Sequence, residues 1–166
     1  MKHLLLLTFL LLTSKLCKAQ WQVELTNAAP TVRVLPNASL HDIAMATFDN
    51  FGPVIYYNPF VTNSVGDLAT AFFMTHEVGH HNLNQAVRMS GNPLAQMWLN
   101  SNQENAADAY AVDFWVARSN VAIIQAGAIA MWNNNNAGDA THPPSRIRAQ
   151  NIISRYMIMT GLPLFP

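Results

Sequence analysis

The segment His76-Glu77-Val78-Gly79-His80 spaces two histidines and a glutamate in a way that suits metal chemistry. In a helix, residues four apart lie on one face, so His76 and His80 can bind one metal ion through their imidazoles. Glu77 cannot join that pair, but it can reach a water at the metal as a general base. Gly79 costs about 1 kcal/mol relative to alanine in a helix, which favours a close approach of backbone or substrate there. The simpler alternative is a solvent-facing helix with two histidines.

Glu104 and Asp108 form a second pair that is four residues apart. A catalytic zinc ion takes three protein ligands and keeps one position open, so Glu104 is the expected third ligand. Asp108 is the expected acceptor for the ring N–H of one ligand histidine. Ala106 and Ala107 are small, which lets this helix pack closely on the metal helix. The alternative is an ordinary acidic pair on an exposed helix face.

A third candidate group lies in Thr141-His142-Pro143-Pro144-Ser145 and the two arginines that follow, Arg146 and Arg148. Taken alone, the histidine fits a proline-rich turn before a helix-capping serine equally well. This group therefore becomes informative only together with the other two.

In this order, the three groups resemble the gluzincin peptidases of the HtpX and CAAX-prenyl-protease family, over roughly residues 55–153. The resemblance implies that Glu77 is the catalytic base. It also implies that His142 and Arg148 lie near the site, with His142 as a candidate to stabilise the oxyanion. Arg148 is expected to serve the site or to pair with Glu77 or Asp108, and Arg146 is its rival. The implied zinc ligands are His76, His80 and Glu104.

Residues 1–19 have the pattern of a secretory signal peptide. A positive start is followed by the apolar run Leu4–Leu12, and Ala19 precedes the expected cut. The run is shorter than the about 20 apolar residues that span a bilayer. The pattern predicts export, to a periplasm or outside the cell, and a single domain over residues 20–166. The alternatives are an N-terminal anchor or acylation of Cys17, which Lys15 and its neighbour disfavour because a lipobox has small residues there.

Removal of this segment takes away all three lysines and the single cysteine. The remaining chain has six arginines and nine carboxylates, a net charge of 6 − 9 = −3, which disfavours nucleic-acid binding. It is also without disulfides. The apolar stretch Val121–Trp132 is too short to span a membrane, so we expect no stable membrane insertion, and we expect a monomer.

The secondary-structure pattern predicts an α+β, zincin-like fold, mostly helical, with a small antiparallel sheet above the metal helix. Trp21–Leu35 is expected to be extended and Ser39–Phe48 helical. Val54–Tyr57 is rich in β-branched and aromatic residues and predicts a strand, which Pro59 places at a sheet edge. Further helices are expected over residues 67–83, 94–99, 101–119, 121–132 and 145–159.

These features predict an exported zinc-dependent endopeptidase that acts on peptides or unfolded proteins through zinc-activated water. The expected edge strand Val54–Tyr57 would pair with an extended substrate. The alternative is a catalytically silent or latent zinc-containing module that binds peptides. Latency would require a segment that fills the cleft, with Leu162–Pro166 or Asn27–Pro36 as candidates.

Overall fold

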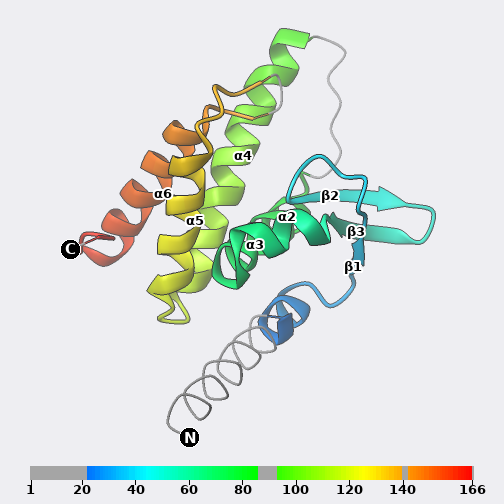
Figure 1. Cartoon of the computed structure of the whole chain (residues 1–166), viewed down its shortest axis with the longest axis horizontal. Coiled ribbons are helices and arrows are strands. Elements are labelled where there is room, and N and C mark those ends of the chain that lie inside the picture. Colours follow the sequence, from blue (N-terminus) through cyan, green and yellow to red (C-terminus); the bar gives the residue numbers. More distant parts are fainter. Residues whose placement is uncertain (1–21, 86–92, 140–141, 166) are drawn as a thin grey trace, which may run out of the picture.

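The computed structural model of this chain describes residues 22–85, 93–139 and 142–165, with the backbone alone for residues 93–100. The expected signal peptide, residues 1–19, lies outside the described residues. Helices predominate, and a three-stranded sheet accompanies them, so the expected α+β class is confirmed. The helix α3 (Asp67–Asn82) lies between the sheet and the helices α4 (Pro93–Val116) and α5 (Val121–Asn134), as Figure 1 shows.

The sheet has the strand order β1-β3-β2, where β1 is Arg33–Pro36, β2 is Ala44–Asp49 and β3 is Gly52–Tyr57. β1 runs parallel to β3 and β2 runs antiparallel to it, so the sheet is mixed rather than antiparallel. The expected strand Val54–Tyr57 is present, but its expected edge position is wrong, because β3 pairs on both sides. The two edges of the sheet are β1 and β2.

The helix expected over Ser39–Phe48 is wrong, because residues 44–49 form β2. This strand pairs with β3 along its whole length, from Ala44 opposite Tyr57 to Asp49 opposite Gly52. Gly52 adopts a φ of 109° at the turn, which glycine tolerates without steric cost. The apolar residues between positions 40 and 46 fit the periodicity of a helix and that of a strand equally well. Hydrogen bonding to β3 stabilises the strand.

The region Trp21–Leu35 was expected to be extended, but residues 22–28 are helical and the strand begins only at Arg33. Leu25 and Ala29 are four residues apart and both are buried in the core. This spacing places them on one face of the segment, and their burial explains why the helical conformation is preferred here.

Pro59 begins a helix instead of marking an edge strand. The helix α2 (Pro59–Val65) starts at this proline, where the missing N–H has no cost, and the Asn58 side chain accepts from the backbone N–H groups of Phe60 and Val61. Asp67 was expected to cap α3 but lies in its first turn, after Gly66. The two helices expected over 94–119 form the single helix α4, and α6 spans Ser145–Thr160.

Two glycines allow neighbouring helices to approach α3. A β-carbon at Gly79 would lie 3.1 Å from the Tyr110 ring of α4. A β-carbon at Gly127 of α5 would lie 2.3 Å from the ring of Phe72, which is fully buried. The close approach expected at Gly79 is therefore that of the Tyr110 side chain. Through these two contacts α4 and α5 pack against α3.

We expect Gly127→Ala to destabilise the protein by about 1–3 kcal/mol, because the added methyl group overpacks the core against Phe72. Urea unfolding followed by circular dichroism measures the change. The loss of stability caused by Gly127→Ala is expected to be smaller in a Phe72→Leu background, because the two side chains occupy the same space. If Gly127→Ala caused the same loss in both backgrounds, this contact would not be its cause.

Candidate active site

The helix α3 presents His76 and His80 to one point in space. Their Nε2 atoms are 3.0 Å apart, and their rings are nearly perpendicular, at 89°. His76 is 3 % exposed and the neighbouring Glu77 is 9 % exposed. The four-residue spacing therefore produces the shared face that helical geometry requires.

Glu104, on α4, completes a group of three potential metal ligands. Its Oε2 atom lies 3.3 Å from His76 Nε2, and its Oε1 atom lies 3.2 Å from His80 Nε2. One ligand atom from each of the three residues lies within 4.8 Å of the others. Residues that are 24 and 28 positions apart in the sequence (104 − 80 and 104 − 76) thus supply one compact donor set, which could hold a metal ion.

Asp108 and Arg148 lie directly behind this group. Asp108 Oδ1 is 2.9 Å from His76 Nδ1, which favours a proton on Nδ1 and leaves the Nε2 lone pair directed at the cluster. Arg148 of α6 donates to both carboxylate oxygens of Asp108, from Nε and Nη2, each at 2.8 Å. Its Nη1 atom is also 3.2 Å from Glu104 Oε2. Arg148 therefore ties α6 to α4 directly, and to His76 of α3 through Asp108.

The buried charges strongly favour a cation at the cluster. Burial alone would lower the pKa of His76, but the Asp108 carboxylate outweighs it and raises that pKa to about 10. Burial alone would raise the pKa of Glu104, but the neighbouring His76 and His80 and the charge of Arg148 hold it well below its usual range. Burial would likewise raise the pKa of Asp108, but Arg148 and His76 lower it below its usual value. Both carboxylates therefore favour positive charge next to them.

The donor set fits a zinc ion. Ligands at about 2.0–2.1 Å from a tetrahedral centre are separated by roughly 3.3 Å. The two Nε2 atoms are 3.0 Å apart, and each lies 3.2–3.3 Å from one of the two carboxylate oxygens of Glu104. Glu104 Oε2 is buried and accepts no well-aligned hydrogen bond from the described residues, and such an atom calls for a partner. Two imidazoles and one carboxylate are ligands that zinc accepts.

Glu77 is held next to the cluster by the edge strand β2. Its Oε2 atom accepts a hydrogen bond from the backbone N–H of Ala46 at 2.6 Å. The sequence interpretation missed Ala46, because it assigned this segment to a helix. A turn between β-prone segments, Asn50 to Gly52, was the signal that could have indicated a hairpin.

The remaining candidates divide into those near the cluster and those away from it. His142 Nε2 is 3.9 Å from Glu104 Oε2 and 3.8 Å from Asp42 Oδ2, so this histidine lies at the rim of the site. Arg146 is exposed and lies over the Trp132 ring, 5.5 Å from its centroid. His81 is turned toward the sheet, with Nε2 3.1 Å from Val54 O. Of the two rival arginines, it is therefore Arg148 that reaches the site.

A groove of about 1180 Å³ runs beside the cluster. Along α3 it extends from Glu77 to Ala69, about 12 Å at 1.5 Å per residue, which is enough for three to four extended residues of a peptide at about 3.3 Å each. Apolar residues of α2, α3 and α5 make up one part of its lining, the apolar wall. They are Val61, Val65, Ala69, Phe73, Ala126, Ile129, Ala130 and Met131.

Neither segment considered for latency lines this groove, as far as its residues are described. Arg33–Pro36 forms β1, on the side of the sheet away from β2. Leu164 is 2 % exposed, packs in the core, and its carbonyl accepts a hydrogen bond from Gln125. Both segments therefore have structural places elsewhere.

Among the described residues, every helix is too short or too polar to cross a membrane.

The family model described as Peptidase U49 matches residues 15–160, which include every candidate site residue. No curated protein and no solved structure matches the chain. Because the family model covers most of its length, the chain belongs to the peptidase U49 family.

Proposed function

We propose that this chain is an exported zinc-dependent endopeptidase whose site works like that of the gluzincins of the HtpX family. The observation that carries the proposal is the convergence of His76, His80 and Glu104, with Glu77 beside them at the head of a groove. Membership of a peptidase family supports hydrolysis of peptide bonds. The proposal includes a signal peptide over residues 1–19, a single zincin-like domain over residues 20–166 and a monomer.

His76, His80 and Glu104 would hold the zinc ion, and Asp108 would orient His76. When bound, zinc supplies a Lewis acid that activates water and polarises the substrate carbonyl. Glu77 takes the proton of the attacking water and passes it to the leaving amine. Its carboxylate is available for this role because it is not one of the proposed metal ligands. His142, at the rim of the groove, would donate a hydrogen bond to the developing oxyanion, and its separation of 3.9 Å from Glu104 Oε2 supports this role.

The edge strand β2 is the element best placed to bind substrate, in place of the central strand β3. The Ala46 N–H points away from β3 toward Glu77, and backbone groups at alternate positions of β2 share this direction. An extended peptide that pairs with this edge would pass directly over the general base. The apolar wall of the groove favours substrates with an apolar side chain near the cleaved bond.

A peptide-library digest with and without a zinc chelator tests the proposed function. We expect about one zinc ion per chain by elemental analysis, loss of cleavage on chelation and recovery with added zinc. The cleaved peptides are expected to carry apolar residues beside the cut. Cleavage that persists in metal-free protein would contradict the zinc assignment. Zinc bound in a closed site without any cleavage would favour the alternative, a peptide-binding module.

A further inference from the structure

The helix α3 ends in a turn that folds back on His80, one of the proposed zinc ligands. Asn84 follows the helix with a φ of 54°, in the left-handed region. The backbone N–H of Asn84 donates to the carbonyl of His81 at 3.1 Å, and that of Gln85 donates to the carbonyl of His80 at 2.8 Å. These two hydrogen bonds and the left-handed residue make a Schellman motif, in which asparagine is an alternative to glycine. The turn therefore fixes the backbone of Gln85 beside His80.

The side chain of Gln85 makes a second contact with the same histidine. Its Oε1 atom lies 3.3 Å from His80 Nδ1. In a Schellman motif the residues at these two positions frequently share an apolar contact, so the turn itself does not require a glutamine. The His80 side chain is only 12 % exposed, so water has little access to its ring. Gln85 thus approaches His80 through both its backbone and its side chain.

This contact suits a histidine that binds a metal ion through Nε2. His80 Nε2 faces the cluster, 3.2 Å from Glu104 Oε1. A neutral imidazole that gives its Nε2 lone pair to a metal ion has its hydrogen on Nδ1, and the amide oxygen of Gln85 can accept a hydrogen bond from it. Asp108 has the corresponding place at His76, where its carboxylate lies 2.9 Å from Nδ1. Each proposed zinc ligand on α3 thus has an acceptor behind its ring.

We propose that Gln85 is a positioning residue of the zinc site, which holds the His80 ring in the orientation and the tautomer that bind the metal ion. The inference rests on the proposed function in one respect, the assignment of His80 as a zinc ligand. Partners of this kind contribute about 10–100-fold to metal affinity. The sequence interpretation missed Gln85, because its place depends on the left-handed turn at Asn84 and not on helical spacing.

Zinc affinity, measured by competition with a chromophoric chelator, tests this assignment. Gln85→Leu is expected to bind zinc about 10–100-fold more weakly than the wild type, because it removes the acceptor. The Tm of the zinc-free variant should not fall, since leucine can make the apolar contact that is common in this turn. Gln85→Glu keeps an acceptor oxygen and should bind zinc within about threefold of the wild type, or more tightly. Unchanged affinity in Gln85→Leu, or the same loss in Gln85→Glu, would overturn the proposal.

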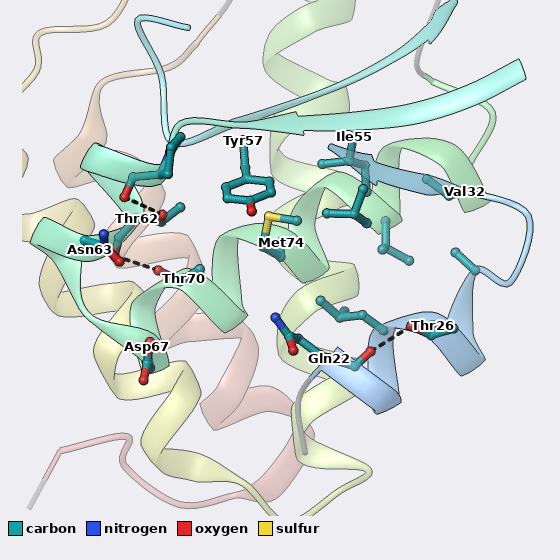
Figure 2. A pocket seen from close by; sticks show the side chains of 15 residues that line it. Gln22, Thr26, Val32, Ile55, Tyr57, Thr62, Asn63, Asp67, Thr70 and Met74 are labelled. Carbon is teal, nitrogen blue, oxygen red and sulfur yellow. Dashed lines mark hydrogen bonds between the residues drawn. The ribbon is translucent and has the colours of Figure 1, made fainter. Parts of the chain in front are cut away.

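The matched control is Gln22→Leu, the same chemical change on the other side of α3. Gln22 lines a second cavity, of about 570 Å³, together with Met74 and Val78 of α3 (Figure 2). Each of these two α3 residues precedes a proposed ligand histidine by two positions, about 200° around the helix, so the cavity lies behind α3 from the cluster. The control is expected to keep the wild-type zinc affinity. A loss equal to that of Gln85→Leu would overturn the proposal, because the effect would not come from the contact with His80.

His80→Ala separates this inference from the proposed function. It is expected to weaken zinc binding more than Gln85→Leu does, because it removes a ligand outright. If His80→Ala weakens binding and Gln85→Leu does not, the positioning role of Gln85 alone is refuted. If His80→Ala has no effect, or the wild type binds no zinc, the ligand assignment fails and the inference fails with it. The expected affinities without any peptide cleavage would support the inference and contradict the endopeptidase.

Discussion

Glu77→Gln is expected to lower kcat/KM for peptide cleavage by about 10²–10⁴-fold while zinc content stays at the wild-type level. The glutamine amide has nearly the same shape as the carboxylate but cannot accept a proton. Glu77 is not in the group of converging ligand atoms, so its replacement leaves the donor set intact. The glutamine oxygen can still accept the hydrogen bond from the Ala46 N–H. The measurements are steady-state cleavage of a peptide selected from the library digest and elemental analysis.

The matched control is Glu24→Gln, the same chemical change at a glutamate that pairs with Arg118 away from the groove. It is expected to cleave at the wild-type rate. If Glu77→Gln retained both zinc and full activity, the role of general base would have to be given to another residue. If it lost zinc as well, the residue would belong to the ligand set.

Arg148→Met is expected to destabilise the protein by about 3–5 kcal/mol, because it leaves a buried carboxylate without its cation. Asp108 is 1 % exposed and Arg148 is 5 % exposed, so water does not replace the lost hydrogen bonds. For a protein of this size, the change corresponds to a fall in Tm on the order of 10 °C. Thermal unfolding of the zinc-loaded protein, followed by circular dichroism, measures it.

Arg146→Met is the control for the Arg148 substitution, because it removes the same charge two residues away. Arg146 is exposed and contacts Trp132 by a cation–π interaction, so a loss of only about 0.5–1 kcal/mol is expected. Adding Asp108→Asn to Arg148→Met should recover part of the stability, since the unpaired charge is then gone. Comparable losses of stability in Arg148→Met and Arg146→Met would show that the buried pair of Arg148 and Asp108 does not stabilise the protein.

The spacing of the candidate ligands could be interpreted without the structure, because it depends on local helical geometry. His76 and His80 lie on one face for the same reason that Glu104 and Asp108 do, namely the period of 3.6 residues per turn. That Glu104 would meet the two histidines was an inference from zinc chemistry, and the packing of α4 on α3 brings these atoms together.

The strands were harder to predict, since strand formation depends on partners that are remote in sequence. The segment around Ala46 has an apolar pattern compatible with a helix, but it forms a strand because it pairs with β3. β3 itself was recognisable from its residues, but its central position follows from pairing with β1, whose residues lie 21 positions earlier in the sequence (54 − 33). Substrate pairing therefore moves from β3 to the edge strand β2.

The sequence alone thus determined the chemistry of the site: two histidines and a glutamate at helical spacing, a second acidic pair, and a histidine and arginines near the end of the chain. Tertiary packing determined which of them meet. It selected Arg148 over Arg146, placed Ala46 against Glu77, and opened a second cavity behind α3. The physical reason is that helical spacing is set by neighbours along the chain, whereas ion pairs, sheet edges and cavities depend on elements that meet only after folding.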